Sequence, residues 1–232
     1  MGRVFITGAG KGIGRAIAER FAAEAWAVSG ITRGAEDVER LNRLPDARFW
    51  RADASDPVEM ARVAEAWGEA PLDLLVNNAG AFAYGTFEET DAPTLERLWR
   101  ANVMSAFTVT RALLPALTAA GSRIGGRIAN IVSVAGGKPL PGKAAYSATK
   151  AAQAALFQCL RAEIAEQGVT VTNIYPGLTF TSSFDGEAVD PATMMAAEDV
   201  ADAVFANCGA VRPGGNCAVE ELVLQPARGV RL

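Results

Sequence analysis

Histidine is absent from the 232-residue chain. Its absence excludes a Ser-His-Asp triad, a Cys-His nucleophile pair and any zinc site that depends on histidine ligands. A general acid or base must therefore be Tyr, Lys, Asp, Glu or Cys. Tyrosine and lysine titrate far above neutrality, so either of them needs neighbours that change its pKa before it can serve.

Cysteine is nearly as scarce, with three residues at positions 159, 208 and 217 and no Cys-x-x-Cys pair. This odd, scattered set makes a disulfide framework or a metal site unexpected and favours a reducing compartment. The first strand-like segment begins at Arg3, which leaves no room for a signal peptide. Ile6 stands where a myristoylation signal beginning at Gly2 needs Ser or Thr. We therefore expect a cytoplasmic protein.

A strong excess of charge of either sign is also missing. The 22 Lys and Arg residues and 26 Asp and Glu residues give a formal net charge of −4. The arginines are scattered along the chain, so we expect no nucleic-acid partner. No apolar run approaches the roughly eighteen residues that a membrane span requires, so we expect no membrane association.

The chain does contain a regular alternation of short β-branched runs and longer alanine-rich runs. The predicted strands are residues 3–7, 27–32, 48–51, 72–77, 126–133, 170–175 and 218–224. The predicted helices are residues 13–25, 36–44, 57–67, 93–120, 144–166 and 198–207. Near-continuous apolar strands separated by helices predict an α/β fold with a doubly wound, seven-stranded parallel sheet and helices on both faces. We expect a single domain over residues 1–232, with a short substrate lid at about residues 178–198.

A glycine-rich segment joins the first predicted strand to the first helix. It has the spacing Gly-x-x-x-Gly-x-Gly, formed by Gly8, Gly12 and Gly14, with Ile13 opening the helix. Glycines at such a turn let the backbone approach a pyrophosphate, and the helix N-terminus offers unpaired N–H groups to it. The segment therefore predicts a dinucleotide site.

The end of the second predicted strand indicates which nicotinamide cofactor is bound. A carboxylate there would bond the ribose hydroxyls of NAD, whereas a cation accepts the 2′-phosphate of NADP. The chain has Thr32-Arg33 and no acid at this point, and Lys11 lies within the glycine segment. Two cations without a carboxylate favour NADP(H). Glu36 and Asp37 follow in the first turn of a predicted helix, where negative charge is stabilised.

Tyr146 and Lys150 are four residues apart on a predicted helix, so their side chains share one face. A neighbouring ammonium, together with a cationic nicotinamide, favours the phenolate and lowers the pKa of Tyr146. Ser133 ends a predicted parallel strand, at the edge where open α/β sheets bind ligands. Its hydroxyl is placed to bond a substrate carbonyl. These three residues predict acid–base chemistry at a carbonyl group.

Taken together, these motifs resemble those of the short-chain dehydrogenase/reductase family. The matching segments are Gly8, Gly12 and Gly14, Asn77-Asn78-Ala79-Gly80, Ser133, Tyr146-Ser147-Ala148-Thr149-Lys150 and Pro176-Gly177. They occur in the family's order, and the resemblance covers residues 3 to about 181. It implies a Rossmann-like sheet, with Tyr146 as acid/base, Ser133 orienting the substrate and Lys150 also holding the nicotinamide ribose. Asn102 matches the family residue that positions a water in a proton relay.

The resemblance also implies further cofactor contacts. The implied contact residues are Asp53 and Ala54 at the adenine, Asn78, Ala79 and Gly80 along the cofactor, and Pro176, Gly177, Thr179 and Thr181 at the nicotinamide carboxamide. Thr179 departs from the family's usual Val or Ile, at a position where a backbone contact is expected.

The predicted substrate walls are apolar, as small-molecule sites usually are. They are Phe82, Tyr84, Leu140, Phe180, Phe184, Met194 and Met195. The predicted lid lacks Lys and Arg, which argues against a substrate held by an anionic group. The resemblance further implies a homodimer or homotetramer, paired through the helices at 93–120 and 144–166, where Ala148, Ala151, Ala152 and Ala155 form a small-residue face.

The sequence therefore predicts an NADP-dependent oxidoreductase, a carbonyl reductase or alcohol dehydrogenase, that acts on a small carbonyl or alcohol substrate. Two alternatives stay open. One is a ketoacyl thioester reductase, and the other is a sensor that binds NADP without turnover.

Overall fold

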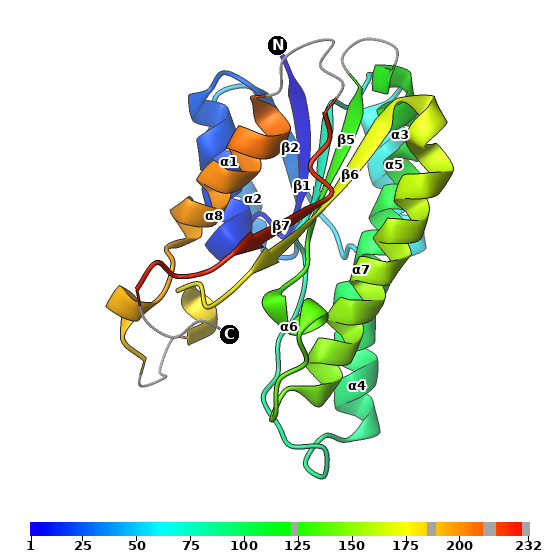
Figure 1. Cartoon of the computed structure of the whole chain (residues 1–232). Coiled ribbons are helices and arrows are strands. Elements are labelled where there is room, and N and C mark those ends of the chain that lie inside the picture. The colour runs from blue at the N-terminus through cyan, green and yellow to red at the C-terminus, as the bar shows by residue number, and fades with distance from the viewer. Residues whose placement is uncertain (122–124, 185–188, 211–216, 229–232) are drawn as a thin grey trace.

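The computed structural model describes residues 1–121, 125–184, 189–210 and 217–228 (Figure 1). Its centre is a seven-stranded, all-parallel sheet with the strand order β3-β2-β1-β4-β5-β6-β7. The strands are β1 (Arg3–Thr7), β2 (Ala27–Thr32), β3 (Ala47–Arg51), β4 (Leu74–Asn77), β5 (Gly126–Ile131), β6 (Val169–Pro176) and β7 (Glu221–Leu224). The order reverses direction between β1 and β4, and such a switch point is where open α/β sheets bind their ligands.

Helices cover both faces of the sheet (Figure 1). One face carries α1 (Gly12–Ala23), α2 (Ala35–Leu41) and α8 (Ala197–Val204), and the other carries α3 (Pro57–Trp67), α5 (Ser105–Gly121) and α7 (Ala144–Ile164). Phe21 of α1 and Val200 of α8 are fully buried on the first face, as are Leu117 of α5 and Phe5 of β1 on the second. The predicted fold class is therefore confirmed.

The prediction of one continuous α-helix over residues 93–120 is wrong. This segment consists of α4 (Ala92–Trp99), a π-helical turn at Arg100–Met104 and then α5. Ser105 Oγ donates to the Ala101 carbonyl at 2.5 Å within this wide turn. Short π-helical turns inside α-helices occur frequently at functional sites, and this one contains Asn102.

Three of the predicted strands also extend beyond the strands in the structure. β4 begins at Leu74 rather than Leu72, where the Asp73 carboxylate accepts the Arg3 N–H at 2.7 Å. β5 ends at Ile131, and Ser133 becomes the N-cap of a short helix that the sequence pattern missed, α6 (Val134–Gly137). β7 begins at Glu221 rather than 218. Its preceding residue, Glu220, accepts the Asn173 N–H at 2.9 Å through its carbonyl.

One helical segment corrects the expectation that no apolar stretch approaches a membrane span. Ala92–Ala120 is 29 residues long and contains an 18-residue window with a mean hydropathy of 1.4. By length and composition alone it could cross a membrane. Half of that window is buried within the described structure, where Val109, Leu113 and Leu117 pack in the core beneath α5.

Candidate active site

The loops that follow β1 and β4 are tied together at the switch point of the sheet. Thr7 ends β1, and its Oγ1 accepts the N–H groups of Asn78 at 3.0 Å and Ala79 at 2.9 Å. In return, Asn78 Nδ2 donates to the carbonyls of Thr7 at 3.0 Å and Gly8 at 3.2 Å. The predicted cofactor residues of the two loops therefore form one hydrogen-bonded unit.

The glycines of this unit are required by close approach and by backbone conformation. Gly8 and Gly12 have φ angles of +65° and +52°, in the left-handed region that glycine tolerates best. A Cβ on Gly14 would lie 2.4 Å from Asn78 Nδ2 and from the Gly8 carbonyl oxygen. α1 begins at Gly12, with the exposed Lys11 at its N-cap and no side chain capping its first N–H groups. This cradle fits the pyrophosphate of a dinucleotide.

An arginine that the sequence pattern did not single out also supports the glycine segment. Arg40 of α2 donates to the Gly10 carbonyl at 2.5 Å and forms an ion pair with Asp37 at 2.7 Å. A Cβ on Gly10 would collide with the Asp37 carboxylate and the Thr32 hydroxyl. Glu36 and Asp37 do lie in the first turn of α2, as predicted.

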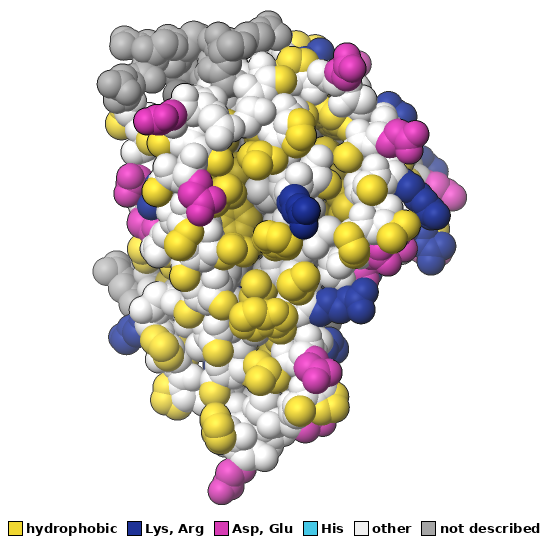
Figure 2. All heavy atoms as spheres, turned by 90° about the vertical axis from the view of Figure 1, so that its right-hand side faces the viewer, with side chains coloured by type: hydrophobic (Ala, Val, Ile, Leu, Met, Phe, Trp, Pro, Cys, Tyr) yellow, Lys and Arg dark blue, Asp and Glu magenta, His cyan; other side chains and the backbone are white. Residues whose placement is uncertain are grey.

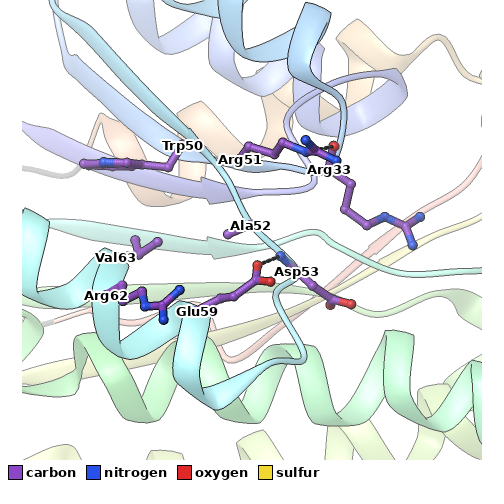
Figure 3. Close-up of a pocket in the computed structure, with 8 residues that line it drawn as sticks. All are labelled: Arg33, Trp50, Arg51, Ala52, Asp53, Glu59, Arg62 and Val63. Atoms are coloured by element: carbon purple, nitrogen blue, oxygen red, sulfur yellow. Dashed lines mark hydrogen bonds between the residues drawn. The ribbon is translucent and has the colours of Figure 1, made fainter.

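A cavity of about 550 Å³ lies beside the carboxyl end of β3 (Figure 3). It is lined by Arg33, Trp50, Arg51, Ala52, Asp53, Glu59, Arg62 and Val63. Arg51 Nε donates to the Arg33 carbonyl at 3.2 Å, and Glu59 accepts the Asp53 N–H at 2.7 Å. Burial tends to raise the pKa of Asp53, but hydrogen bonds from the backbone and hydroxyl of Ser55 outweigh it and lower that pKa. Three guanidinium groups and the carboxylates of Asp53 and Glu59 therefore line this cavity.

The side chains of Tyr146 and Ser133 lie close enough for the Ser133 hydroxyl to affect the pKa of the Tyr146 phenol. Tyr146 lies in the first turn of α7, and Ser133 follows β5 and accepts the Ala135 N–H at 3.2 Å as the N-cap of α6. Burial raises the pKa of Tyr146, and the Ser133 hydroxyl opposes that rise. In the protein alone, burial penalises the phenolate and outweighs the effect of Ser133. The predicted lowering, which depends on a cationic nicotinamide beside a charged Lys150, stays a prediction.

Lys150 is nearly inaccessible, with an exposed fraction of 4%. Its Nζ donates to the Ile131 carbonyl and to Gln153 Oε1, each at 2.9 Å. Burial lowers the pKa of Lys150 from its ordinary value of 10.5 to about 7. The lysine is thus held at the end of β5 and changes its charge near neutrality.

Asn102 is buried, and its side chain is fully engaged by protein groups. Its Oδ1 accepts the Ala81 N–H at 2.8 Å, and its Nδ2 donates to the Ala81 carbonyl and to Thr149 Oγ1, each at 3.0 Å. A Cβ on Gly80 would lie 2.8 Å from Asn102 Oδ1 and 3.6 Å from Lys150 Nζ. Asn102 and Lys150 therefore converge across Gly80, and the Asn102 side chain anchors the loop after β4.

Aromatic rings extend from Tyr146 toward the predicted substrate walls. The Phe82 ring centroid lies 4.8 Å from that of Tyr146 and 4.4 Å from that of Tyr84. Lys143 was not predicted, yet its Nζ lies 5.5 Å from the Phe82 centroid and 5.3 Å from the Tyr84 centroid. Partial burial lowers the pKa of Lys143. Its place three residues before Tyr146 in the sequence was the available signal, and in the structure it is the N-cap of α7.

The predicted lid is anchored at both of its ends. The Phe180 N–H donates to the Met195 carbonyl at 2.8 Å, and the Met195 N–H donates to the Leu178 carbonyl at 3.0 Å. Met195 itself is buried among core residues, so the structure places it in the core rather than on a substrate wall. Phe184 and Met194 are partly exposed, and residues 185–188 of the lid lie outside the described residues.

The remaining predicted contacts follow β6. Gly177 N–H donates to the Leu224 carbonyl at 2.8 Å, and Thr179 Oγ1 donates to the Gly177 carbonyl at 3.1 Å. The side chain of Thr181 lies against Gly12, since a Cβ on that glycine would be 3.2 Å from Thr181 Cγ2. The segment after β6 is thereby brought to the glycine cradle.

Comparison with known proteins identifies the family of the chain. A family model described as short chain dehydrogenase matches residues 3–190. A sulfoacetaldehyde reductase from Chromohalobacter salexigens is 36% identical over 220 residues, which cover 87% of this chain and 86% of the relative.

Two solved structures have the same fold. The Pseudomonas aeruginosa RhlG/NADP active-site complex is 27% identical with a TM-score of 0.86, covering 97% of this chain and 95% of that one. An alcohol dehydrogenase from the archaeon Thermococcus sibiricus, complexed with 5-hydroxy-NADP, has a TM-score of 0.89 at 23% identity and covers 100% of this chain and 99% of that one. Because the family model matches residues 3–190, which are most of the chain, this protein belongs to the short-chain dehydrogenases, a family of oxidoreductases.

Proposed function

We propose that this protein is an NADP-dependent carbonyl reductase, able to run in reverse as an alcohol dehydrogenase. The observation that carries the proposal is the placement of the Ser133 hydroxyl close enough to the Tyr146 phenol to affect its pKa, in a site that also holds the buried Lys150. Hydroxyl, phenol and amine groups at a strand end are the set needed to bind a carbonyl oxygen and give it a proton.

The proposed reaction is a reduction in which Ser133 and Tyr146 bond the substrate carbonyl oxygen. The cofactor, when bound, supplies a hydride to the carbonyl carbon. Tyr146 gives its hydroxyl proton to the oxygen and is left as a phenolate, which must regain a proton before the next turnover. The raised pKa of Tyr146 suits an acid that is protonated at neutral pH. Lys150 in its charged form stabilises the phenolate, and Asn102 holds the loop beside it.

NADP is favoured over NAD by the charges at the end of β2 and β3. Arg33 stands where a carboxylate would be needed for the ribose hydroxyls of NAD. Arg51 and Arg62 line the same cavity, so two further cations stand beside Arg33, which is one of the two cations that the sequence indicated. Gly8, Gly12 and Gly14 would receive the pyrophosphate, and Asp53 would receive the adenine.

The substrate we favour is a small aldehyde or ketone that carries an anionic group. Lys143 places a partly buried cation on the aromatic rings that extend from Tyr146. This cation revises the argument from the lid, which has no Lys or Arg of its own. The relative named sulfoacetaldehyde reductase suggests the first compound to assay, because sulfoacetaldehyde joins an aldehyde to a sulfonate.

The test is NADPH consumption, followed by absorbance, with sulfoacetaldehyde, neutral aldehydes, ketones and ketoacyl thioesters. Y146F is the matched control because it removes the acid and keeps the ring, and we expect it to lower kcat by a factor of about 10² to 10⁴. Equal turnover by Y146F and wild type would refute the mechanism. NADPH binding without turnover of any compound would favour the sensor, and turnover confined to thioesters would favour the ketoacyl reductase.

We further propose that the protein forms a homo-oligomer in the cytoplasm through the surface made by α4, α5 and α7. This face carries many apolar side chains (Figure 2). Among them Leu95, Trp99, Met104 and Phe107 have exposed fractions between 38% and 45%. Exposed apolar patches of this kind mark interaction surfaces. Sedimentation of the wild type against a variant with Trp99 and Phe107 both replaced by Ser tests this proposal, and an unchanged monomer would refute it.

A further inference from the structure

Gln153 is a buried polar residue that the proposed mechanism does not use. It lies on α7 three residues after Lys150 and has an exposed fraction of 0%. Its Oε1 accepts a hydrogen bond from Lys150 Nζ at 2.9 Å, and its Nε2 donates to Asn130 Oδ1 at 2.6 Å. Gln153 therefore connects the lysine to β5.

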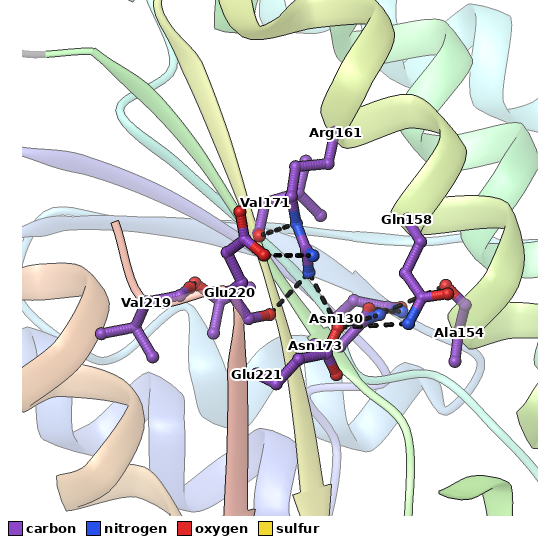
Figure 4. A network of polar contacts seen from close by, with 10 residues as sticks. Asn130, Ala154, Gln158, Arg161, Val171, Asn173, Val219, Glu220 and Glu221 are labelled. Carbon is purple, nitrogen blue, oxygen red and sulfur yellow. Dashed lines mark hydrogen bonds and ion pairs between the residues drawn. The ribbon is translucent and has the colours of Figure 1, made fainter. Parts of the chain in front are cut away.

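The hydrogen bonds continue across the sheet to its edge (Figure 4). Asn130 Nδ2 donates to Asn173 Oδ1 at 2.8 Å, and Asn173 Nδ2 donates to Glu221 Oε1 at 3.4 Å and to the Ala154 carbonyl at 3.2 Å. The parallel register places Asn130 opposite Asn173, and Asn173 opposite Glu221. Four side chains on α7, β5, β6 and β7 thus form one chain of hydrogen bonds, which we call the amide chain.

The amides of this chain are all oriented in one direction, and the groups at its two ends each require that same orientation. An ammonium only donates hydrogen bonds, so it requires the oxygen of Gln153 to face Lys150. A carboxylate only accepts them, so it requires the NH₂ group of Asn173 to face Glu221. Each amide has one oxygen and one NH₂ group. Every oxygen therefore points toward the lysine and every NH₂ group toward the carboxylate.

Glu221 is held as a carboxylate by several donors. Arg161 Nη2 lies 3.1 Å from Glu221 Oε1, and Gln158 Nε2 donates to the same oxygen at 3.3 Å. Burial tends to raise the pKa of Glu221, but hydrogen bonds from Tyr175, Arg161 and Gln158 outweigh it and lower that pKa. The end of the amide chain at β7 is therefore an acceptor at neutral pH.

We propose that Gln153 is a positioning residue, and that the amide chain anchored on Glu221 presents an oxygen to Lys150 and holds its Nζ against the end of β5. Without this direction, the Gln153 amide could turn its NH₂ group toward the ammonium and repel it. The aligned amides place the negative ends of their dipoles toward the lysine. The proposal rests on the catalytic role of Lys150 in the proposed function.

The first test replaces Gln153 by methionine, which keeps the length of the side chain and removes its hydrogen bonds to Lys150, Asn130 and the Ile131 carbonyl. We expect Q153M to lower kcat by about tenfold, the effect of losing one hydrogen bond to a charged group, and to leave the KM of the carbonyl substrate within about twofold. The Glu220 side chain pairs with the same arginine as Glu221 but bonds none of the side-chain amides of the amide chain, so E220Q is the matched control and keeps wild-type kcat. A kcat of Q153M equal to that of wild type would overturn the proposal.

The second test needs no turnover, so it still decides the matter if the proposed function fails in the Y146F assay. Glutamate at position 153 can accept from Lys150 but cannot donate to Asn130. The two amides beyond it would then have to turn over, and an amide oxygen would face Glu221. A glutamine at position 221 supplies a donor and removes this conflict.

We therefore expect E221Q to lower the melting temperature of the wild-type background and to raise that of the Q153E background by about 3 °C. E220Q again serves as the control, because it removes a neighbouring charge and should act alike in both backgrounds. Equal shifts from E221Q in the two backgrounds would show that the positions are independent, and the proposal would be wrong.

Discussion

The burial of Lys150 predicts that the free energy of unfolding depends on pH, and this dependence provides a demanding test of the structure. The pKa of the lysine is lowered by burial from 10.5 to about 7. Each pKa unit corresponds to about 1.4 kcal/mol. Keeping the ammonium in the folded protein below pH 7 therefore costs about 5 kcal/mol relative to the unfolded chain.

The sign follows from proton binding. Below pH 7 the lysine is charged in both states, and the whole cost is present. Between pH 7 and 10.5 the unfolded chain holds a proton that the folded protein has released, so the free energy of unfolding rises by about 1.4 kcal/mol per pH unit. Above pH 10.5 the lysine is neutral in both states and the cost is gone.

The K150M variant should lack this dependence. It leaves Gln153 Oε1 without the lysine donor, while the Ile131 carbonyl keeps Gln153 Nε2 at 3.5 Å, and one unsatisfied buried group costs about 1–3 kcal/mol. We expect K150M to unfold at higher urea concentration than wild type at pH 6, with a stability gain of about 2 kcal/mol, while its activity is lost. Between pH 7 and 9 the difference should move against the variant by about 3 kcal/mol.

The measurement is urea unfolding of the cofactor-free protein at several pH values and one fixed protein concentration. K138M is the matched control, since Lys138 is exposed and its replacement should change stability by the same small amount at every pH. A K150M difference that stays constant from pH 6 to 9 would refute the reasoning, because the lysine would then bind its proton equally well in the folded and unfolded states.

Three further predictions concern the cofactor and the substrate. R33A should raise the Kd of NADPH by about tenfold or more and that of NADH by no more than about twofold; equal losses in fluorescence titrations would remove Arg33 as the reader of the 2′-phosphate. K143M should lower kcat/KM for sulfoacetaldehyde by about tenfold while neutral aldehydes of similar size keep theirs, and equal losses for both would contradict an anion site. G14A should destabilise the protein by about 1–3 kcal/mol and abolish NADPH binding, because its Cβ would meet the Gly8 carbonyl; wild-type stability in urea would mean that the two loops are not packed as described.

Much of the framework could be predicted from local signals. α3 has the predicted ends because the Asp56 carboxylate caps its first N–H groups and Gly68 ends it with a φ of +77°. β1 and β2 also have their predicted bounds, since each is a short, largely apolar run that ends shortly before a helix. Tyr146 and Lys150 could be paired because a helix places residues i and i+4 on one face.

Other features depend on contacts that no local pattern reports. Arg40 has the appearance of an ordinary surface residue of α2, and its bond to the Gly10 carbonyl exists only because the fold brings residues 30 positions apart together. The effect of burial on the pKa of Tyr146 was missed for a similar reason. Spacing along a helix indicates which groups are near, whereas desolvation depends on everything that packs around them.

The amide chain shows that some long-range contacts can be predicted once the strand order is known. Asn130 and Asn173 each interrupt a strand that is otherwise largely apolar, and both are fully buried. A buried amide must find hydrogen-bond partners, and in a parallel sheet the nearest candidates are residues at the same register on the adjacent strands. Once β5, β6 and β7 are known to be neighbours, these asparagines are expected to bond one another and to reach Glu221. The identity of the partner on α7, Gln153, needs the packing of the helix on the sheet, which strand order alone does not supply.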